Sequence, residues 1–417
     1  MKRWSAMPGL LLALLLGLAG AAQAAGEAVV GMSEKVFEAL NEAQAALDAE
    51  DSAAARGILE ALLERRKLSA YETAHTLNLL GYCLYEANDL PGAQATYERA
   101  LALEELPGSM QAMLLVTLGQ VSLVQEDHRG AEGYLRRLLA LPEQDLPRHR
   151  VLLAAALIGQ ARFADALEPL KSAIAEAGAD GSAPPEQWLS MLASVYYERE
   201  DYPAMRETMA RLATLYPREQ YLLNLAALHG QLGDSGRQLA LVEALRDDGR
   251  LSQETRLVML ANLFLAEGLP WEAARLLEAA MDDGRVAADR RNLETLSQAW
   301  YLAAETERAI EPLAAAAALA EDGELYLRLA RLHMDANAWA AAQEAAGLAI
   351  ERGGLREEGH AWLVRGMAAA RREQFGTARD YFTEAAQHSD AARYAAQWLA
   401  WIYSEAEAAR QREQLGS

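Results

Sequence analysis

A small residue recurs along almost the whole chain at intervals of 33 to 39 residues, and this spacing limits the possible folds more than any other feature. Around each of these anchor residues, leucine and other apolar side chains stand at helical spacing. The anchors are Gly81, Gly119, Ala154, Ala193, Ala226, Ala261, Ser297, Ala330 and Gly366, with Ala43 as a fainter first copy. Such a chain folds as stacked copies of one unit, because a lone unit cannot bury its apolar face.

The stretch from Ala74 to Pro107 shows what one unit contains. Leu77 and Leu84 flank Gly81 at helical spacing and predict a first amphipathic helix. Asn88-Asp89 then supplies a turn. A second helix follows directly, so the unit is predicted to be a helical hairpin.

The second helix of each unit has its own pattern. Most units place an alanine twelve residues after the anchor: Ala55, Ala93, Ala131, Ala166, Ala273, Ala309, Ala342 and Ala378. Two units have Met205 and Gln238 there instead. A large side chain comes four residues later, as at Tyr97, Leu135, Leu170, Leu277, Leu313 and Phe382. We expect the small residues to let two helix backbones approach closely, while the large side chains fill the space beside them.

This order of small, large, alanine and aromatic residues resembles the tetratricopeptide repeat (TPR), although Pro107 comes two residues later than the helix-ending proline of that family. The resemblance implies an all-α fold, a TPR-like α-solenoid. We expect a right-handed superhelix of about ten helical hairpins plus a C-terminal capping helix. Composition agrees, because alanine and leucine dominate and no stretch alternates as a strand would.

Residues 1–24 have the pattern of a secretory signal peptide. Lys2 and Arg3 precede an apolar run from Leu10 to Ala22, and Ala22 and Ala24 form a small-residue cleavage site. The run is shorter than the roughly 20 residues that span a bilayer, which favours cleavage over a membrane anchor. No cysteine follows it, which excludes a lipoprotein anchor. We therefore expect a periplasmic protein of a Gram-negative cell with no transmembrane segment in the mature chain.

The rest of the chain divides by its composition. Residues 25–32 form a linker, and TPR-like repeats occupy residues 33–180 and 181–390. Between the two sets of repeats, the Gly- and Pro-containing junction 177–185 coincides with the longest anchor spacing, and whether it is a hinge stays open. Residues 391–417 are predicted to be a capping helix and polar tail, with Tyr394, Trp398 and Ile402 on one side and charged residues from Glu405 to Gln414.

Residues that could carry out catalysis or bind a metal are scattered. The histidines fall about one to a repeat without an HExxH pair, and Cys83, the one cysteine, lies in a helix where packing explains it. The sequence Asp-Asp-Gly-Arg at 247–250 and again at 282–285 lacks the ligand spacing of a calcium loop and fits a glycine helix cap. The segment 233–236 lacks the context of a serine nucleophile. We expect no enzyme, cofactor or metal site.

The remaining candidate for function is a surface. A net charge of −21 argues against nucleic acid. In a TPR-like hairpin the first helices form the concave groove, and the positions that face it carry tyrosines, amides and a carboxylate. The predicted partner-binding residues are His75, Asn78, Tyr82, Tyr85, Glu86, Tyr197, Asn262, Gln298 and Tyr301. Amides and phenols suit an extended peptide, since they bond its backbone and pack its side chains.

A narrower resemblance covers nearly all the predicted mature chain. The runs LANLFLAEGLPWEAARLLEAAMDDGRV and HAWLVRGMAAARREQFGTARDYFTEAA are similar to exported TPR proteins encoded beside TonB, ExbB and ExbD in Gram-negative bacteria. The resemblance implies a non-enzymatic periplasmic scaffold that serves a TonB-type outer-membrane uptake system. Its partner would be TonB, ExbD or a related periplasmic segment. The alternative is an assembly or stabilising factor for another envelope complex, in outer-membrane biogenesis or polysaccharide export.

Overall fold

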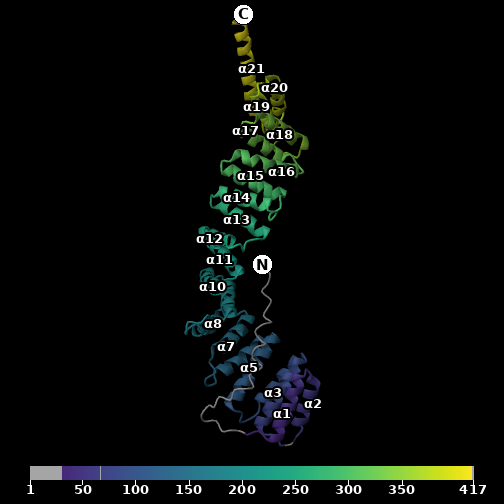
Figure 1. The fold of residues 1–417 in the computed structure, drawn as a ribbon, viewed down its shortest axis with the longest axis vertical. Helices are drawn as coiled ribbons and strands as arrows, with labels where there is room; N and C mark the ends of the chain where they lie inside the picture. Colours follow the sequence, from purple (N-terminus) through teal and green to yellow (C-terminus); the bar gives the residue numbers. More distant parts are fainter. Residues whose placement is uncertain (1–30, 66, 416–417) are drawn as a thin grey trace. The chain divides into compact units, whose positions relative to one another are not determined.

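Helices account for all the regular secondary structure that is described. A computed structural model describes residues 31–65 and 67–415, with side chains to Ser404, and these residues form 21 helices and no strand (Figure 1). The all-α prediction is confirmed. The predicted signal peptide, residues 1–24, lies outside the described residues, as does most of the predicted linker, residues 25–32.

The helices belong to two compact units, one ending at Pro217 and the other beginning at Arg218. The first unit contains α1 (Glu34–Asp48), α2 (Ser52–Leu63), α3 (Ala70–Glu86), α4 (Leu90–Leu101), α5 (Gly108–Val124), α6 (His128–Leu139), α7 (Pro147–Gly159), α8 (Phe163–Ala177), α9 (Glu186–Glu198) and α10 (Tyr202–Leu215). The predicted junction 177–185 lies inside this unit, between α8 and α9. Its role as a hinge and the predicted boundary at residue 180 stay predictions.

The second unit continues the same alternation. It contains α11 (Glu219–Gln231), α12 (Ser235–Asp247), α13 (Glu254–Ala266), α14 (Pro270–Asp282), α15 (Arg290–Leu302), α16 (Thr306–Ala318), α17 (Glu324–Asp335), α18 (Trp339–Arg352), α19 (Glu358–Arg371), α20 (Phe375–Ala385) and α21 (Ala392–Leu415).

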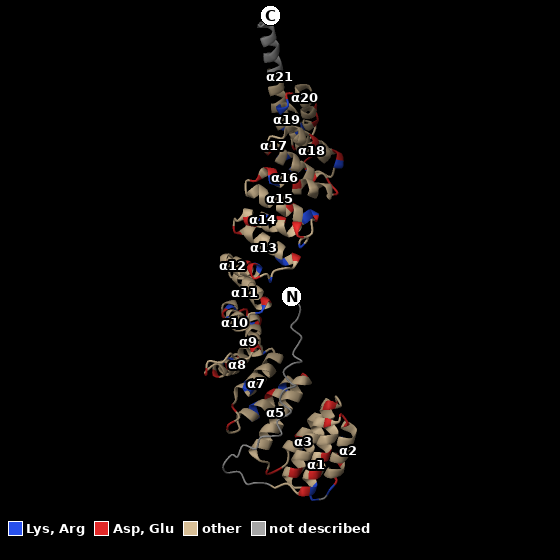
Figure 2. Ribbon diagram, viewed as in Figure 1, with Lys and Arg blue, Asp and Glu red and all other residues tan. Residues whose placement is uncertain are grey.

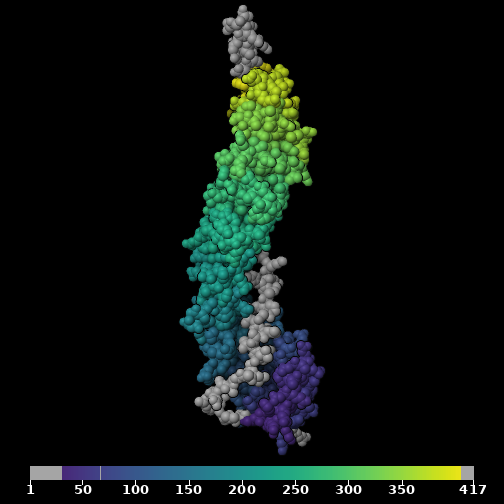
Figure 3. Space-filling view, in the orientation of Figure 1, coloured from purple at the N-terminus to yellow at the C-terminus, as the bar shows by residue number. Residues whose placement is uncertain are grey.

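Hairpins stack in sequence order within each unit. Every odd-numbered helix from α1 to α19, here called a first helix, packs against the even-numbered second helix that follows it. Within the second unit, colour changes steadily from one hairpin to the next (Figure 3). Each hairpin therefore buries its apolar face against its sequence neighbours, and the TPR-like solenoid fold is confirmed.

The anchor glycines sit where the two helices of a hairpin come closest. A Cβ added to Gly81 would lie 2.6 Å from the Tyr97 ring, and one added to Gly366 would lie 2.6 Å from the Phe382 ring. Real Cβ atoms do not approach other atoms so closely, so a larger residue would force the ring away. The predicted pairing of each small anchor with a large side chain sixteen residues later is confirmed here.

Alanines twelve residues after the anchors occupy the other tight contact. All eight of them are fully buried: Ala55, Ala93, Ala131, Ala166, Ala273, Ala309, Ala342 and Ala378. Met205 and Gln238, which break the pattern, are only half-buried. At the one serine anchor, the Ser297 hydroxyl donates to the Ala309 carbonyl over 2.8 Å, which explains how a polar residue is accommodated there.

Each hairpin turn contains a residue in the left-handed conformation, seven positions after the anchor. These residues are Glu50, Asn88, Glu126, Ala161, Glu200, Gly233, Gly268, Ala304, Asn337 and Glu373. In the best-matching repeat the Asn88 N–H donates to Tyr85 and the Asp89 N–H to Leu84, which closes a Schellman motif. The Asp89 carboxylate then accepts from the Gly92 N–H and caps the second helix.

The two Asp-Asp-Gly-Arg segments are helix caps, as predicted. Gly249 and Gly284 have φ values of +71° and +69°, directly after α12 and α14. The neighbouring carboxylates pair with arginines, because Asp247 lies 2.8 Å from Arg246 and Asp283 lies 2.8 Å from Arg285. These aspartates therefore lie at the ends of α12 and α14, where they pair with arginines.

Helix α21 closes the last hairpin, against which it packs along α20 and α19. Ile402 is buried and Trp398 stacks on Phe382 at 5.5 Å, as the capping prediction requires. Tyr394, which the sequence predicts on the same side of the helix, is 51% exposed. The charged side chains from Glu405 to Gln414 lie outside the described side chains.

Candidate protein-interaction surface

First helices of neighbouring hairpins contact each other directly. In the first unit α1 contacts α3 and α5 contacts α7, and in the second unit α17 contacts α19. First helices therefore lie side by side in these three places. The side chains that first helices expose are here called the first-helix wall. All nine residues predicted to bind a partner lie on first helices: α3 carries five, α9 one, α13 one and α15 two.

The α3 helix is fixed before it presents any side chain. Ser69 and Glu72 form a capping box at its start, in which the Glu72 N–H donates to the Ser69 hydroxyl and the Ser69 N–H to the Glu72 carboxylate. Its buried face contributes Leu77, Leu80 and Leu84 to the core. The opposite side of α3 therefore belongs to the first-helix wall.

The five predicted residues on α3 differ in how far they are exposed. Asn78, Tyr82 and Tyr85 are half-buried, and Glu86 is exposed. Burial, the charge of Glu86 and a hydrogen bond to that carboxylate raise the pKa of Tyr82. The phenol therefore stays protonated beside the Glu86 carboxylate.

His75 is half-buried, like Asn78, Tyr82 and Tyr85. Its ring packs edge-on against Tyr71 at 4.5 Å, and burial lowers the pKa of the imidazole. Its Nε2 is buried with no hydrogen-bond partner among the described residues. A neutral histidine that packs against an aromatic ring is suited to support the wall from beneath.

The other four predicted residues are all exposed. Tyr197 and Tyr301 are 41% and 49% exposed, and Asn262 and Gln298 are also exposed. The Tyr301 hydroxyl donates to Asp335 at 3.3 Å, which links α15 to the end of α17. Gln298 and Tyr301 both lie on α15, and Asn262 lies on α13, one hairpin earlier. Tyr197 lies three hairpins after the α3 group, in the first unit.

The chain carries an excess of negative charge. The chain has 60 aspartates and glutamates against 39 lysines and arginines, and Figure 2 shows acidic residues scattered over α1, α2 and α3. An excess of this size attracts basic segments over a distance of about one Debye length. The wall therefore combines short-range contacts from tyrosine and amide groups with a longer-range attraction.

Cys83 lies behind the wall and is inert. The side chain is 2% exposed, and burial raises the pKa of its thiol to about 11. A thiol that stays protonated and covered is a packed apolar group, as predicted.

A cluster of metal ligands and a helix that could span a membrane are both absent from the residues that the structure describes. Among residues 31–65 and 67–415, no histidine, cysteine, aspartate and glutamate side chains gather in a group of three or more that could hold a metal ion. No helix in the same ranges is long and apolar enough to cross a membrane.

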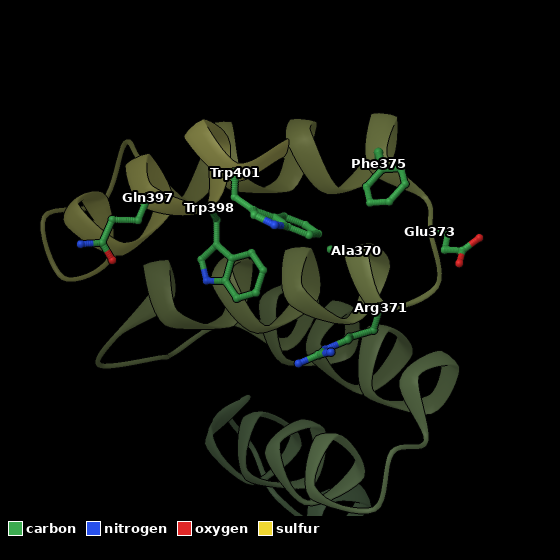
Figure 4. Close-up of a pocket in the computed structure, with 7 residues that line it drawn as sticks. All are labelled: Ala370, Arg371, Glu373, Phe375, Gln397, Trp398 and Trp401. Carbon is green, nitrogen blue, oxygen red and sulfur yellow. The ribbon is translucent and has the colours of Figure 1, made fainter. Parts of the chain in front are cut away.

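The sequence prediction missed one feature, an aromatic cleft at the end of the second unit. This C-terminal aromatic cleft has a volume of about 710 Å³ and is lined by Arg371, Glu373, Phe375, Gln397, Trp398 and Trp401 (Figure 4). Trp401 contacts Trp398 at 5.5 Å and Phe375 at 6.0 Å, both edge to face. The spacing of Trp398 and Trp401 on one helix was the signal in the sequence, but a packing role explained Trp398 equally well.

No family profile and no curated protein matches the chain. Several solved TPR structures are similar to parts of it. A TPR protein from Parabacteroides merdae is 14% identical over 72% of this chain and 100% of its own, with a TM-score of 0.40. The C-terminal part of a TPR protein from Cytophaga hutchinsonii is 13% identical over 67% and 95%, with a TM-score of 0.41.

A third solved structure is YrrB, described as a TPR protein with an unusual peptide-binding site. It is 19% identical over 47% of this chain and 91% of its own, with a TM-score of 0.38. Similarity at this level does not indicate what the present chain binds.

Proposed function

We propose that this chain is a non-enzymatic scaffold whose first-helix wall binds an extended segment of a protein partner. The observation that carries the proposal is that first helices in each unit expose tyrosines or amides, above all Tyr197 in the first unit and Tyr301 in the second, which are 41% and 49% exposed. Large amphipathic side chains bury much area at low entropic cost and can donate to a peptide backbone.

The wall suits an extended ligand better than a compact one. Its polar groups are spread over separate helices, with neighbouring members about one hairpin apart, as for Asn262 and Gln298. An extended peptide can reach successive helices in turn, and each contact then adds a side-chain or backbone interaction. The acidic surroundings favour a ligand with lysine or arginine, so affinity should fall with added salt.

As its setting, we propose the periplasm and a TonB-type uptake system, with TonB, ExbD or a related periplasmic segment as the partner. The support is the resemblance of residues 260–286 and 360–386 to exported TPR proteins encoded beside those components. The signal-peptide pattern of residues 1–24 agrees with such a location.

Titration of the purified protein with the periplasmic segments of TonB and ExbD tests this function. Saturable binding that weakens with salt, and weakens about tenfold in Tyr197→Ala or Tyr301→Ala, is the expected result. Tyr202→Ala is the matched control, because Tyr202 lies on the second helix α10. If neither segment binds at any salt concentration, the partner is wrong. If a segment binds and both wall variants bind as the native protein does, the wall is wrong.

A further inference from the structure

The C-terminal aromatic cleft shares no residue with the nine predicted partner-binding residues. It leaves large aromatic side chains exposed to solvent, which is unfavourable. Trp401 is 40% exposed and Phe375 37%. Figure 4 shows the rings of Trp398, Trp401 and Phe375 in a row between Gln397 and Glu373. Exposed aromatic side chains that gather in a hollow mark a binding site more often than isolated ones do.

One cation, Arg371, and one carboxylate, Glu373, line the cleft. Arg371 lines it, and the structure gives this guanidinium no ion pair with any described carboxylate; it lies over the Trp339 ring at 5.6 Å. The neighbouring Arg372 differs, because it donates to Gln343 at 2.8 Å. The carboxylate of Glu373 points away from the rings (Figure 4). In a chain with net charge −21, this cation stands beside an aromatic row.

We propose that the C-terminal aromatic cleft binds a proline-containing acidic segment of a partner protein in the polyproline II conformation. Proline rings pack on aromatic faces, and grooves lined by such faces recognise this conformation at low entropic cost. The exposed Trp401 indole supplies an N–H for a carbonyl of the segment, and Arg371 pairs with its carboxylate.

Other ligand chemistries fit the cleft less well. An organic cation would be attracted by the rings but repelled by Arg371. An amphipathic helix needs apolar anchors over successive turns, whereas polar Gln397 and Glu373 end this aromatic row (Figure 4). Charge complementarity therefore selects an acidic segment, whereas the first-helix wall favours a basic one.

Fluorescence anisotropy with the full chain and labelled, end-capped peptides tests the proposal. The probes are repeats of Pro-Pro-Glu, Pro-Pro-Lys and Ala-Ala-Glu. We expect saturable binding of the Pro-Pro-Glu peptide and affinities lower by about tenfold or more for the other two. Arg371→Glu should reverse the preference between the Glu and Lys peptides.

Variants on α21 locate the contact. Trp401→Ala should weaken binding of the Pro-Pro-Glu peptide by about tenfold or more, because it removes a central aromatic anchor. Tyr403→Ala is the matched control, since Tyr403 is 61% exposed on the same helix and does not line the cleft. Circular dichroism checks that both variants keep their helix content.

Three results would overturn the proposal. The first is no saturable binding of the Pro-Pro-Glu peptide, and the second is equal loss in Trp401→Ala and Tyr403→Ala. The third is that no peptide binds and that the chain self-associates in a way that Trp401→Ala abolishes. The ligand of the cleft would then be a second copy of the chain. None of these results depends on the first-helix wall.

Discussion

Glu72 joins two hairpins through one buried carboxylate. It accepts from the Ser33 hydroxyl at 2.6 Å, the Ser33 N–H at 2.9 Å and the Ser69 N–H at 2.8 Å, while only 6% of the residue is exposed. The bonds from the Ser33 hydroxyl and from the Ser69 and Ser33 backbones lower its pKa to about 2. The start of α1 is thereby fixed to the start of α3.

Glu72→Gln tests this link through its pH dependence. A carboxylate whose pKa is lower in the folded chain stabilises the fold above its unfolded pKa, and loses that effect as pH falls. We expect the native chain to exceed the variant by about 1 to 2 kcal/mol near neutral pH, and the difference to shrink from about pH 5 downward.

Denaturant unfolding at several pH values measures this difference. Glu60→Gln is the control, since Glu60 makes only an exposed pair with Arg56 on the same helix, and such pairs contribute little. A native-minus-variant difference that stays constant between about pH 6 and about pH 3 would contradict the assigned role of Glu72.

At the scale of the elements, the hairpin turn is the unit that repeats most strictly. A left-handed residue stands seven positions after every anchor, although only Gly233 and Gly268 are glycines. A non-glycine residue in this conformation costs about 1 to 2 kcal/mol. Hydrogen bonds that close the turn, such as that from the Asp89 N–H to the Leu84 carbonyl, offset this cost.

Ala304→Gly should therefore stabilise the chain by about 0.5 to 1 kcal/mol, because glycine adopts a φ of +62° without strain. The gain is smaller than the full strain energy, because glycine also gives the unfolded chain more conformational entropy. Ala315→Gly, an equally exposed position inside α16, should destabilise it by a similar amount. Thermal melting of the two variants compares them. A lower melting temperature for Ala304→Gly would mean that the turn is not strained.

The close contact between the two helices of a hairpin supports a second prediction. Ala93 is fully buried on α4, whereas Ala95 on the same helix is exposed. Ala93→Arg should cost about 3 kcal/mol or more, because a long charged side chain is forced into a contact made for a methyl group. Ala95→Arg should leave the chemical-denaturation midpoint nearly unchanged. Equal effects of the two substitutions would place the repeat register elsewhere.

For the whole molecule, the repeat and its packing positions could be predicted, because the anchor, the alanine and the large residue each recur. The division after Pro217 could not, since the pattern runs on through Ala226. The turn conformation was hidden because glutamate and alanine carry no left-handed signal at Glu200 or Ala304. Side-chain exposure on α21 was also hidden, because it depends on which face lacks a following hairpin.

The wall residues illustrate the same limit. Their assignment to first helices is a direct consequence of the repeat, and the structure places all nine there. Exposure depends on local neighbours, so His75 is half-buried beside Tyr71 while Tyr197 is 41% exposed. Which of these residues touches a partner is a property that neither the repeat nor the fold determines.

A protein partner is proposed to bind along the first helices. Site-specific photo-crosslinking in intact cells measures this directly, with the reactive side chain placed at Tyr197 or Tyr301 and, as the control, at Tyr202 on α10. We expect a protein adduct at Tyr197 and at Tyr301 and none at Tyr202. Adducts at Tyr202 alone, or no protein adduct at either wall position, would contradict the proposal.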